Sequence, residues 1–573
     1  MKEIVETSTV LAIKIDLKTT KIFFFDIVDE KYHLIATSEA DSTALPPYND
    51  IREGISKAID RIQQITGKHL VDEESNFILP GQSDGSGVDH LVLTFGFFSQ
   101  IKVISMGLLE SVSLESLTKL LANTQLDHID QIGMNDPRKL EEIIGIFTNK
   151  MPEMVIISGG IDDGASNSVF KQLEMLLFCI KLVPKEKRPY IIFAGNEDLE
   201  PKIHETIGDL TNYSMTSKIR FSIKEENLLP AFLKVNKINA ELLNQKIGGF
   251  AQVASSCQSV PMPLSQSMIL MAKFLSLVTD DRSKKILVID FGNESVTFTS
   301  GFNGESTFNF TDFSLHQNFE KYINQINLQK FAQTTYEPLE EEEINNYFWQ
   351  KTIFPEAIPT TQNHLAIEKA LVTDIICNKL ADIIQKNPGF PSTFDQVIFS
   401  GDIFSNYFSF SESLLSIIDG VLPTGTTTFY MDTHGILPVL GSIAPINRYL
   451  PVQILESSTI ALLAKVFTIT SPVKIGTKLA IITTEFEDGT KSETIIEQGM
   501  IYRLPVQPGQ FVNISIEPKA KIDSDLNTGS RAISVQSGIC GIIVDARGRP
   551  FVLPKEPVKR IEVFKKWLFQ LLI

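Results

Sequence analysis

Two segments far apart in the 573-residue chain share one pattern, and this weak internal repeat constrains the fold more than any other feature. Residues 10–26 (VLAIKIDLKTTKIFFFD) and residues 286–302 (ILVIDFGNESVTFTSGF) each predict a hydrophobic strand, a tight turn and a second strand. Aligning the segments sets Lys14 against Asp290 and Asp16 against Gly292. The repeat therefore predicts two equivalent strand-turn-strand units.

The first unit continues with further local signals. Three β-prone runs within residues 10–36 predict an antiparallel meander. Apolar residues at three- and four-residue intervals then predict a helix over residues 51–65, with Asp50 as its cap and Glu53 in its first turn. A Gly/Ser-rich loop at residues 80–88 leads into the next part of the chain.

Apolar runs alternate with helical segments from about residue 100 to 235, which is typical of a doubly wound α/β domain. The strand candidates are residues 101–106, 154–157 and 190–194. A second α/β part starts at Ile286, with a helix over residues 364–385 and a strand over 396–399. Residues 454–554 are rich in Thr, Val and Ile, and Asp488-Gly489 between two strand-like runs predicts a hairpin in an all-β region.

The two predicted turns have features of phosphate-binding sites. A strand ending in Asp-x-Gly before hydroxyl residues suits a nucleotide, because the carboxylate holds magnesium, glycine admits backbone N–H groups and hydroxyls donate to phosphate. Two such turns, with a later strand ending at Gly401 (VIFSG) beside the nucleoside, resemble the superfamily of actin, sugar kinases and heat-shock chaperone ATPases. The resemblance implies an actin-like (ribonuclease H-like) ATPase fold with an inserted doubly wound α/β domain and a C-terminal all-β domain.

This fold implies six segments. They are the first part of actin-like lobe I (1–95), the inserted α/β domain (96–235), return helices to lobe I (236–285), lobe II (286–450), a β-rich domain (451–556) and an amphipathic C-terminal helix (557–573).

The resemblance narrows to the MutL-type accessory proteins of adenosylcobalamin-dependent glutamate mutase, which are unrelated to the mismatch-repair protein of similar name. It rests on residues 11–26, 102–116 (KVISMGLLESVSLES), 155–169 (VIISGGIDDGASNSV), 191–199 (IIFAGNEDL), 288–297 (VIDFGNESVT) and 429–444 (FYMDTHGILPVLGSIA). The family implies a cytoplasmic accessory or reactivating protein of the chaperone type. In that mechanism, closure around a nucleotide changes affinity for a cobalamin-dependent mutase and helps to exchange damaged cofactor.

The first phosphate turn departs from the family pattern Asp-Ile-Gly-Ser-Thr-Thr-Thr, which here is KIDLKTT from Lys14 to Thr20. A lysine cannot hold magnesium, and Asp16 places negative charge where backbone should meet an anion. The second turn has Asn293 and Glu294 after its glycine, and Asp402 replaces the second glycine expected after Gly401. These changes predict a pseudo-ATPase with lost or weakened activity rather than an enzyme.

The candidate nucleotide-binding residues are therefore Lys14, Thr19, Thr20, Asp290, Gly292, Asn293, Ser295 and Gly401. Asp290 is a magnesium ligand only if nucleotide binds, and no residue is assigned as catalytic. Lys14 either pairs directly with phosphate, giving binding without turnover, or forms a local ion pair with Asp16 in a vestigial cleft. Retained catalysis is the third alternative.

A second candidate site is the small-residue loop SGGIDDGAS after the predicted strand at residues 154–157. Its candidate ligand or partner residues are Gly159, Gly160, Asp162, Asp163 and Gly164. The alternative is a tight β-to-α turn.

Several other functions are disfavoured by composition. The net charge of −17 argues against nucleic-acid binding. The four cysteines lie far apart, which predicts reduced core thiols and no zinc. His434 follows Asp432 in a partial cobalamin motif, but Leu437 stands where that motif requires glycine, so no direct cobalamin binding is expected.

A soluble, cytoplasmic protein is expected. The N-terminus lacks the pattern of a secretory signal, and the most apolar stretch, residues 268–278, is far shorter than the ~20 residues of a spanning helix. Glutamates 340–343 are expected in the first turn of a helix.

The C-terminal segment, residues 557–573, predicts an amphipathic helix. Its apolar face comprises Ile561, Phe564, Leu568 and Leu571, and its basic residues Lys559, Arg560, Lys565 and Lys566 are expected outside that face. The helix packs on its own β-rich domain, docks on a partner or lies on an anionic membrane. An actin-like scaffold organised through sheet edges and this helix is the alternative function, with a divergent active ATPase as a third.

Overall fold

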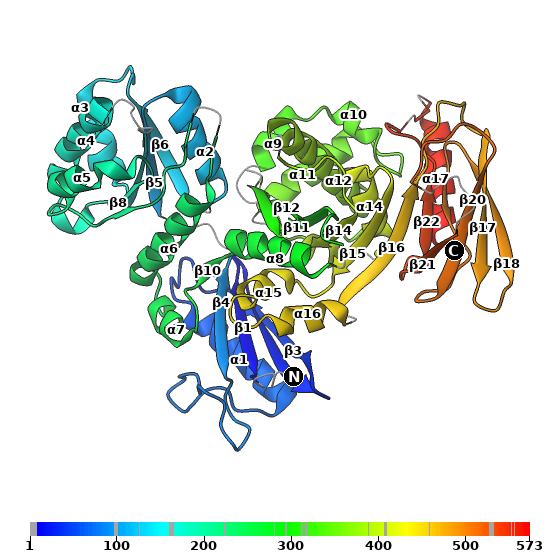
Figure 1. Cartoon of the computed structure of the whole chain (residues 1–573), viewed down its shortest axis with the longest axis horizontal. Helices are drawn as coiled ribbons and strands as arrows, with labels where there is room; N and C mark the ends of the chain where they lie inside the picture. Colours follow the sequence, from blue (N-terminus) through cyan, green and yellow to red (C-terminus); the bar gives the residue numbers. More distant parts are fainter. Residues whose placement is uncertain are drawn as a thin grey trace. The chain divides into compact units, whose positions relative to one another are not determined.

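The computed structural model of the chain is shown in Figure 1. It describes residues 8–96, 101–124, 126–159, 166–222, 225–279, 281–292, 295–310, 313, 315, 319–387, 389–405, 409–457, 459–525, 532–551, 553–554 and 556–572. The chain divides into two compact units, one formed by Met1–Ser267 with Pro445–Asn447 and the other by Met268–Ala444 with Arg448–Ile573.

The first sheet of the first unit begins with the predicted antiparallel meander. Strand β2 pairs antiparallel with both β1 and β3. On the other side of β1, strand β4 pairs with β1 in parallel, and β10 pairs with β4 in parallel. The sheet order is therefore β3-β2-β1-β4-β10. The strands are β1 (Val10–Ile15), β2 (Thr19–Val28), β3 (Lys31–Asp41), β4 (His90–Phe95) and β10 (Met262–Pro263).

The predicted first helix is present as α1 (Arg52–Thr66), which packs on β2 and β3 through its apolar face. Its cap differs from the prediction, since Ile51 and not Asp50 occupies the N-cap position. Asp50 forms a backbone bridge with Gly248, so it stays outside the helix and its carboxylate accepts from the backbone N–H of Arg52. Glu53 lies in the first turn as expected.

The inserted part of the first unit is a five-stranded parallel sheet with the order β6-β5-β7-β8-β9, which confirms the predicted doubly wound arrangement. Figure 1 shows α2 on one face and α3, α4 and α5 on the other. The strands are β5 (Lys102–Gly107), β6 (Asp127–Gly133), β7 (Met154–Ser158), β8 (Tyr190–Phe193) and β9 (Tyr213–Met215). The helices are α2 (Glu115–Ala122), α3 (Leu140–Gly145), α4 (Ser166–Lys181), α5 (Glu200–Ile207), α6 (Leu229–Lys246) and α7 (Phe250–Ser256).

The second unit repeats the strand arrangement of the first sheet. Its eight-stranded sheet has the order β13-β12-β11-β14-β15-β16-β22-β19, and the first five strands pair as in β3-β2-β1-β4-β10. These strands are β11 (Ile286–Phe291), β12 (Val296–Phe302), β13 (Glu305–Phe310), β14 (Gln396–Ser400) and β15 (Thr426–Asp432). Helix α8 (Leu264–Val278) begins in the first unit and continues into the second. The other helices of the second unit are α9 (Phe319–Gln325), α10 (Leu328–Ala332), α11 (Glu341–Ile353), α12 (Gln362–Lys386), α13 (Asp402–Ser405), α14 (Phe410–Val421), α15 (Leu437–Ile443) and α16 (Tyr449–Glu456).

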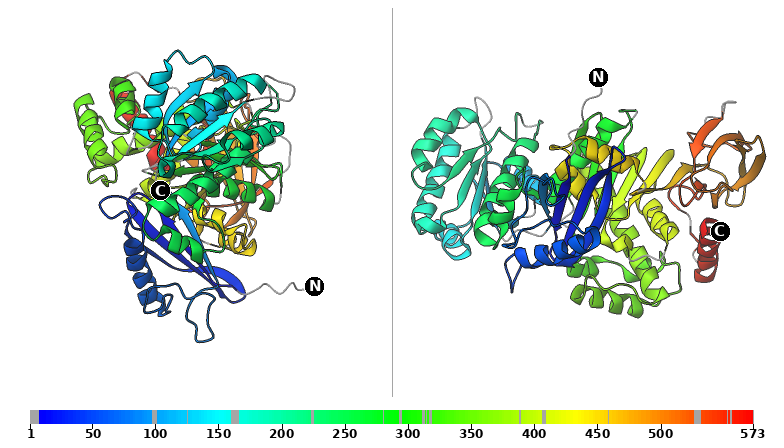
Figure 2. Two further views of the ribbon diagram at one scale, coloured as in Figure 1. Left: turned by 90° about the vertical axis from the view of Figure 1, so that its left-hand side faces the viewer. Right: turned by 90° about the horizontal axis from the view of Figure 1, so that it is seen from below.

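The C-terminal strands are shared between two sheets. Strands β16 (Ile460–Thr468), β22 (Ile542–Asp545) and β19 (Ile501–Arg503) extend the eight-stranded sheet. A separate antiparallel sheet, seen from below in Figure 2, comprises β18 (Lys491–Glu497), β17 (Lys478–Phe486), β20 (Phe511–Pro518) and β21 (Ile533–Gln536). The hairpin predicted at Asp488-Gly489 joins β17 to β18, with Gly489 at φ 80°.

The C-terminal helix α17 (Pro557–Leu572) packs on β19, within the segment predicted as the β-rich domain, which is the first of the three alternatives predicted. Phe564, Trp567 and Leu571 are buried in the core of the second unit, and the indole Nε1 of Trp567 donates to the carbonyl of Gly499 at 2.9 Å. Arg560 was predicted outside the apolar face but is buried, because it precedes Phe564 by one helical turn and therefore lies on the same inward stripe. Helix α11 carries glutamates 341–343 in its first turn as predicted, whereas Glu340, expected with them, occupies the N-cap position.

Candidate functional site

The first predicted phosphate turn connects β1 to β2 in the first unit. The backbone N–H of Asp16 donates to the carbonyl of Thr19 at 2.8 Å and closes the turn. The ammonium Nζ of Lys14 lies 2.8 Å from Oδ2 of Asp16, and the side chains of Lys14 and Asp16 are only 9% and 14% exposed. Thr20 is buried and Thr19 partly buried. The ion pair expected for a vestigial turn is therefore present.

The Asp16 carboxylate also lies against the end of β4. The backbone N–H of Gly96 donates to the carbonyl of Ile15 at 2.7 Å, which brings these segments together. A Cβ atom on Gly96 would lie 2.2 Å from Oδ1 of Asp16, so only glycine leaves room for this carboxylate. The turn thus presents negative charge at the place where a phosphate-binding turn presents backbone N–H groups.

The second predicted phosphate turn follows β11 in the second unit. Asp290 is the buried penultimate residue of β11, opposite Thr297 on β12 and Ser400 on β14. The backbone N–H of Gly292 donates to the carbonyl of Ser295 at 3.0 Å. Asn293 and Glu294 lie outside the described residues. The acid and glycine of a phosphate turn are therefore both in place here.

Gly401 follows β14 with φ 124°. A Cβ atom there would lie 2.2 Å from the carbonyl oxygen of Phe291, so the glycine allows the end of β14 to cross close to the end of β11. Asp402, where the resemblance implies a second glycine, begins α13.

A polar row along the ends of the parallel strands was not singled out from the sequence. Asp290, Ser400 and Asp432 occupy neighbouring register positions on β11, β14 and β15. The hydroxyl of Ser400 donates to Oδ2 of Asp432 at 3.1 Å. Asp432 also accepts from the backbone N–H groups of His434 at 3.1 Å and Leu437 at 2.8 Å. The sequence feature that could have predicted this row is the polar residue at or near the end of each of these buried strands.

The roles of Asp432 and His434 are thereby structural. The Asp432 carboxylate caps the first turn of α15, and His434 lies in the turn before that helix, as predicted. Thr297 and Thr299 on β12 have buried hydroxyl oxygens with no hydrogen-bond partner among the described residues.

The predicted ligand loop in the inserted domain lies largely outside the described residues. Gly160, Asp162, Asp163 and Gly164 belong to the segment that the structure does not describe. A Cβ atom on Gly195 would lie 2.2 Å from the carbonyl oxygen of Gly159, so the loops after β7 and β8 pack backbone against backbone. This close backbone contact is sufficient reason for a glycine at position 195, so the glycine need not indicate a ligand.

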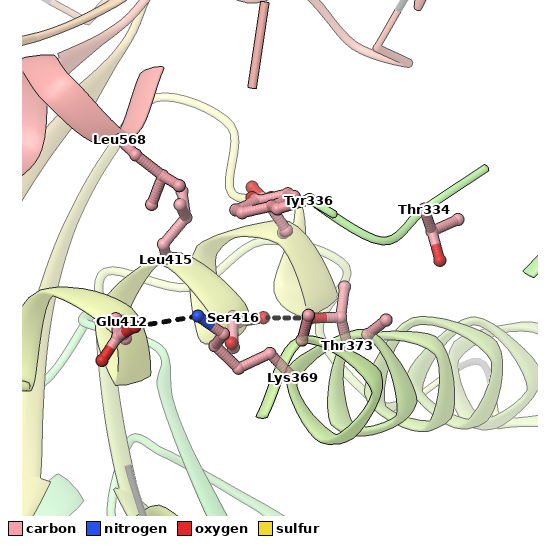
Figure 3. A pocket seen from close by; sticks show the side chains of 11 residues that line it. Thr334, Tyr336, Lys369, Thr373, Glu412, Leu415, Ser416 and Leu568 are labelled. Atoms are coloured by element: carbon pink, nitrogen blue, oxygen red, sulfur yellow. Dashed lines mark hydrogen bonds and ion pairs between the residues drawn. The ribbon is translucent and has the colours of Figure 1, made fainter. Parts of the chain in front are cut away.

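A pocket in the second unit lies beneath α17 (Figure 3). Lys369 on α12 pairs with Glu412 on α14 at 2.9 Å, and Leu568 reaches toward them from α17. The hydroxyl of Tyr336 donates to Asp419 at 2.7 Å, and burial raises the pKa of Tyr336 well above its usual value. These polar side chains pair with one another within the pocket wall. We therefore interpret the pocket as part of the packing contact between α17 and the rest of the second unit.

In the described part of the chain, no group of three or more His, Cys, Asp or Glu side chains is arranged to hold a metal ion. All four cysteines are free, with Cys179 and Cys540 buried and the others partly buried. Burial raises the pKa of Cys179 to about 11 and that of Cys257 to about 12, which suppresses their reactivity. None of the described helices combines the length and hydropathy needed to cross a membrane.

Magnesium nucleotide does not fit the first turn as it stands. The position that needs a carboxylate holds Lys14, whose charge is already matched by Asp16 at 2.8 Å. The second turn retains Asp290 and Gly292 but lies in the other unit. The donor set for a nucleotide-bound metal is therefore incomplete at the first turn, and no hydrolytic step follows from it.

The two sheets with their repeated β-meander and parallel fourth and fifth strands define an actin-like (ribonuclease H-like) fold. A family model described as MutL protein matches residues 10–459, and the chain belongs to this family. A sequence search of curated proteins finds no match.

The solved structures that match this chain include three that each share 10% or less of their sequence with it. Nucleotide-free acetone carboxylase has 10% identity and a TM-score of 0.32, covering 86% of this chain and 81% of that chain. Acetate kinase from Entamoeba histolytica has 9% identity and a TM-score of 0.22, with coverage of 72% and 86%. A Ppx/GppA protein from Aquifex aeolicus has 8% identity and a TM-score of 0.17, with coverage of 69% and 66%.

Proposed function

We propose that this chain is a cytoplasmic accessory protein that reactivates an adenosylcobalamin-dependent mutase without turning over ATP. Membership of the MutL protein family supports the accessory role. The Lys14–Asp16 ion pair is the main observation that supports our proposal that the chain does not hydrolyse ATP.

The electrostatics of the first turn oppose a bound nucleotide. Asp16 is mostly shielded from water, and like charges a few ångströms apart repel more strongly in a protein interior than in bulk solvent. A nucleotide phosphate placed at this turn would either face the Asp16 carboxylate or compete with it for Lys14. The chain thus lacks both the magnesium ligand and the neutral backbone surface that hydrolysis requires at this position.

Without turnover, binding of the partner itself sets the conformational balance. A reactivating protein needs two conformations with different affinities for the mutase. In an ATP-driven protein, the nucleotide shifts that balance. Here the β1–β2 turn is held by the chain's own ion pair, so we expect the mutase and its cofactor to select the conformation.

A reactivation assay tests this function. A purified adenosylcobalamin-dependent mutase is inactivated with hydroxocobalamin, and its recovery is followed after adding this chain and adenosylcobalamin, with and without ATP and magnesium. We expect equal recovery in both cases. Recovery only with ATP would reject the absence of turnover, and no recovery together with no co-elution of the two proteins would reject the accessory role.

The matched variant for this assay is Lys14→Asp/Asp16→Gly, which restores the family residues at both positions. We expect its reactivation to become sensitive to ATP, because the restored turn offers a carboxylate for magnesium and a glycine for phosphate. An ATP response equal to that of the wild type would show that this turn does not control nucleotide use.

A further inference from the structure

Helix α11 and the loop after it expose large apolar side chains at one place. Trp349, Ile353, Phe354 and Ile358 are 41%, 70%, 60% and 61% exposed. Trp349 and Ile353 are one helical turn apart and share a face, whereas Phe354 begins the following loop and Ile358 lies within it, before α12 begins at Gln362. Such a concentration of exposed aromatic and branched side chains marks a contact surface rather than ordinary protein exterior.

The loop between α11 and α12, residues 354–361, is held in place by a buried ion pair. The ammonium of Lys351 is 1% exposed and lies 2.8 Å from Oε1 of Glu368, which is fully buried. The same ammonium donates to the carbonyl of Ala357 at 2.8 Å, and Tyr347 donates to the other oxygen of Glu368 at 2.7 Å. The buried ion pair therefore holds the loop against α12, and little conformational entropy is lost when a partner binds.

An acidic hollow adjoins the apolar side chains on α11. It is lined by Glu340, Glu342, Glu343, Asn346, Tyr347, Gln350 and His364. Glu342, Asn346 and Gln350 follow one another at helical spacing, next to the stripe of Trp349 and Ile353. The three glutamates and four apolar side chains together form the α11 surface, which suits an apolar partner carrying positive charge.

Helix α17 offers a surface of that chemistry. Its inward stripe is buried, but Val558 and Phe569 on the outer side are each 63% exposed. Lys565 and Lys566 are exposed between them. Val558, Glu562, Lys565 and Phe569 lie along one stripe of the helix, and Lys566 adjoins it. These five residues form the α17 surface, an apolar face on which two lysines outnumber one glutamate, in a chain whose net charge is −17.

We propose that the α11 surface of one copy of the chain binds the α17 surface of a second copy. Phe569 and Val558 pack against Trp349, Ile353 and Phe354, while Lys565 and Lys566 approach the glutamates of the hollow. Because two different surfaces meet, the contact is heterologous, so each added copy leaves one surface of each kind open. This assembly goes beyond the proposed reactivating function and does not require nucleotide.

Sedimentation velocity over a concentration series of the full chain tests the proposal, with far-UV circular dichroism to confirm folding of every variant. The variants are Ile353→Glu/Phe354→Glu on the α11 surface and Lys565→Glu/Lys566→Glu on the α17 surface. All four residues are exposed or partly exposed, so folding is expected to persist. We expect the wild-type sedimentation coefficient to rise with concentration and each variant to weaken association about tenfold or more.

Mixing the two variants separates a heterologous contact from any other. Each variant keeps the surface that the other has lost, so the mixture should form a one-to-one complex that grows no further. Phe178→Glu, at a 50% exposed position on α4, is the matched control and should associate like the wild type.

Three results would overturn the proposal. They are a monomer at every concentration up to about 100 µM, association unchanged in both variants, and failure of the mixed variants to pair. Binding of a monomeric chain to anionic phospholipid vesicles, abolished by Lys565→Glu/Lys566→Glu, would instead assign the α17 surface to a membrane.

Discussion

The ammonium of Lys14 lies 2.8 Å from Oδ2 of Asp16, within the first predicted phosphate turn, where the resemblance to the family implies Asp and Gly at these two positions. One substitution removes the magnesium ligand and the other adds a second charge, and the two charges satisfy each other. The turn thereby keeps its shape without a ligand. This relationship links the sequence departure to the proposed loss of ATP turnover.

The two residues should be strongly coupled in stability. Lys14→Met or Asp16→Asn alone leaves the other charge buried without this partner, so we expect each to destabilise the first unit by about 3 kcal/mol. The double variant should lose less than the sum of the two. Hydrogen exchange of β1 and β2 measures this loss. Both tryptophans lie in the second unit, so tryptophan fluorescence should stay unchanged, and additive losses would contradict the coupling.

Helix α17 should stabilise the second unit through its inward face. Trp567→Ala removes a 2% exposed indole and its hydrogen bond to Gly499, and we expect a loss of about 3–5 kcal/mol. Phe569→Ala on the same helix removes a 63% exposed ring and should change stability by less than about 0.5 kcal/mol. Urea denaturation of both variants at low protein concentration makes the comparison, and equal losses would mean that α17 does not pack as described.

The buried carboxylate of Asp545 should make the second unit sensitive to acid. Burial raises the pKa of Asp545, but the charges and hydrogen bonds of Arg547 and Arg549 outweigh burial and hold the pKa well below its ordinary value of 3.8. A depressed folded-state pKa stabilises the fold above the ordinary value, and this contribution is lost as pH falls toward the folded-state pKa. Asp545→Asn should therefore cost about 3–5 kcal/mol at neutral pH.

The pH dependence of that difference is the measurement. Wild type and Asp545→Asn are unfolded in urea at several pH values, with tryptophan fluorescence as the probe, since Trp349 and Trp567 both lie in the second unit. The gap between them should be constant above about pH 5 and narrow as pH falls below 3.8, because the wild type then loses stability that the variant never had. A gap that widens in acid would contradict the assigned ion pairs.

Local patterns predicted most of the secondary structure. The runs at residues 10–28 became β1 and β2, and the repeat at residue 286 became β11 and β12, because hydrophobic strands flanking a short turn have few alternatives. The Lys14–Asp16 pair was also open to prediction, since the two residues are close in sequence and have opposite charge.

Features set by distant contacts were missed. The row of Asp290, Ser400 and Asp432 depends on the register of three strands, which no local pattern specifies. Asp50 was displaced from the cap position by its bridge to Gly248. Arg560 was expected outside the apolar face because it is charged, although its helical position places it on the inward stripe.

Calorimetric titration with ATP and magnesium measures whether the chain binds nucleotide at all. We expect no binding heat for the wild type, binding by the Lys14→Asp/Asp16→Gly variant, and loss of that binding when Asp290→Ala is added. Binding by the wild type that Asp290→Ala weakens would contradict this expectation, because the chain would then hold nucleotide despite the Lys14–Asp16 ion pair.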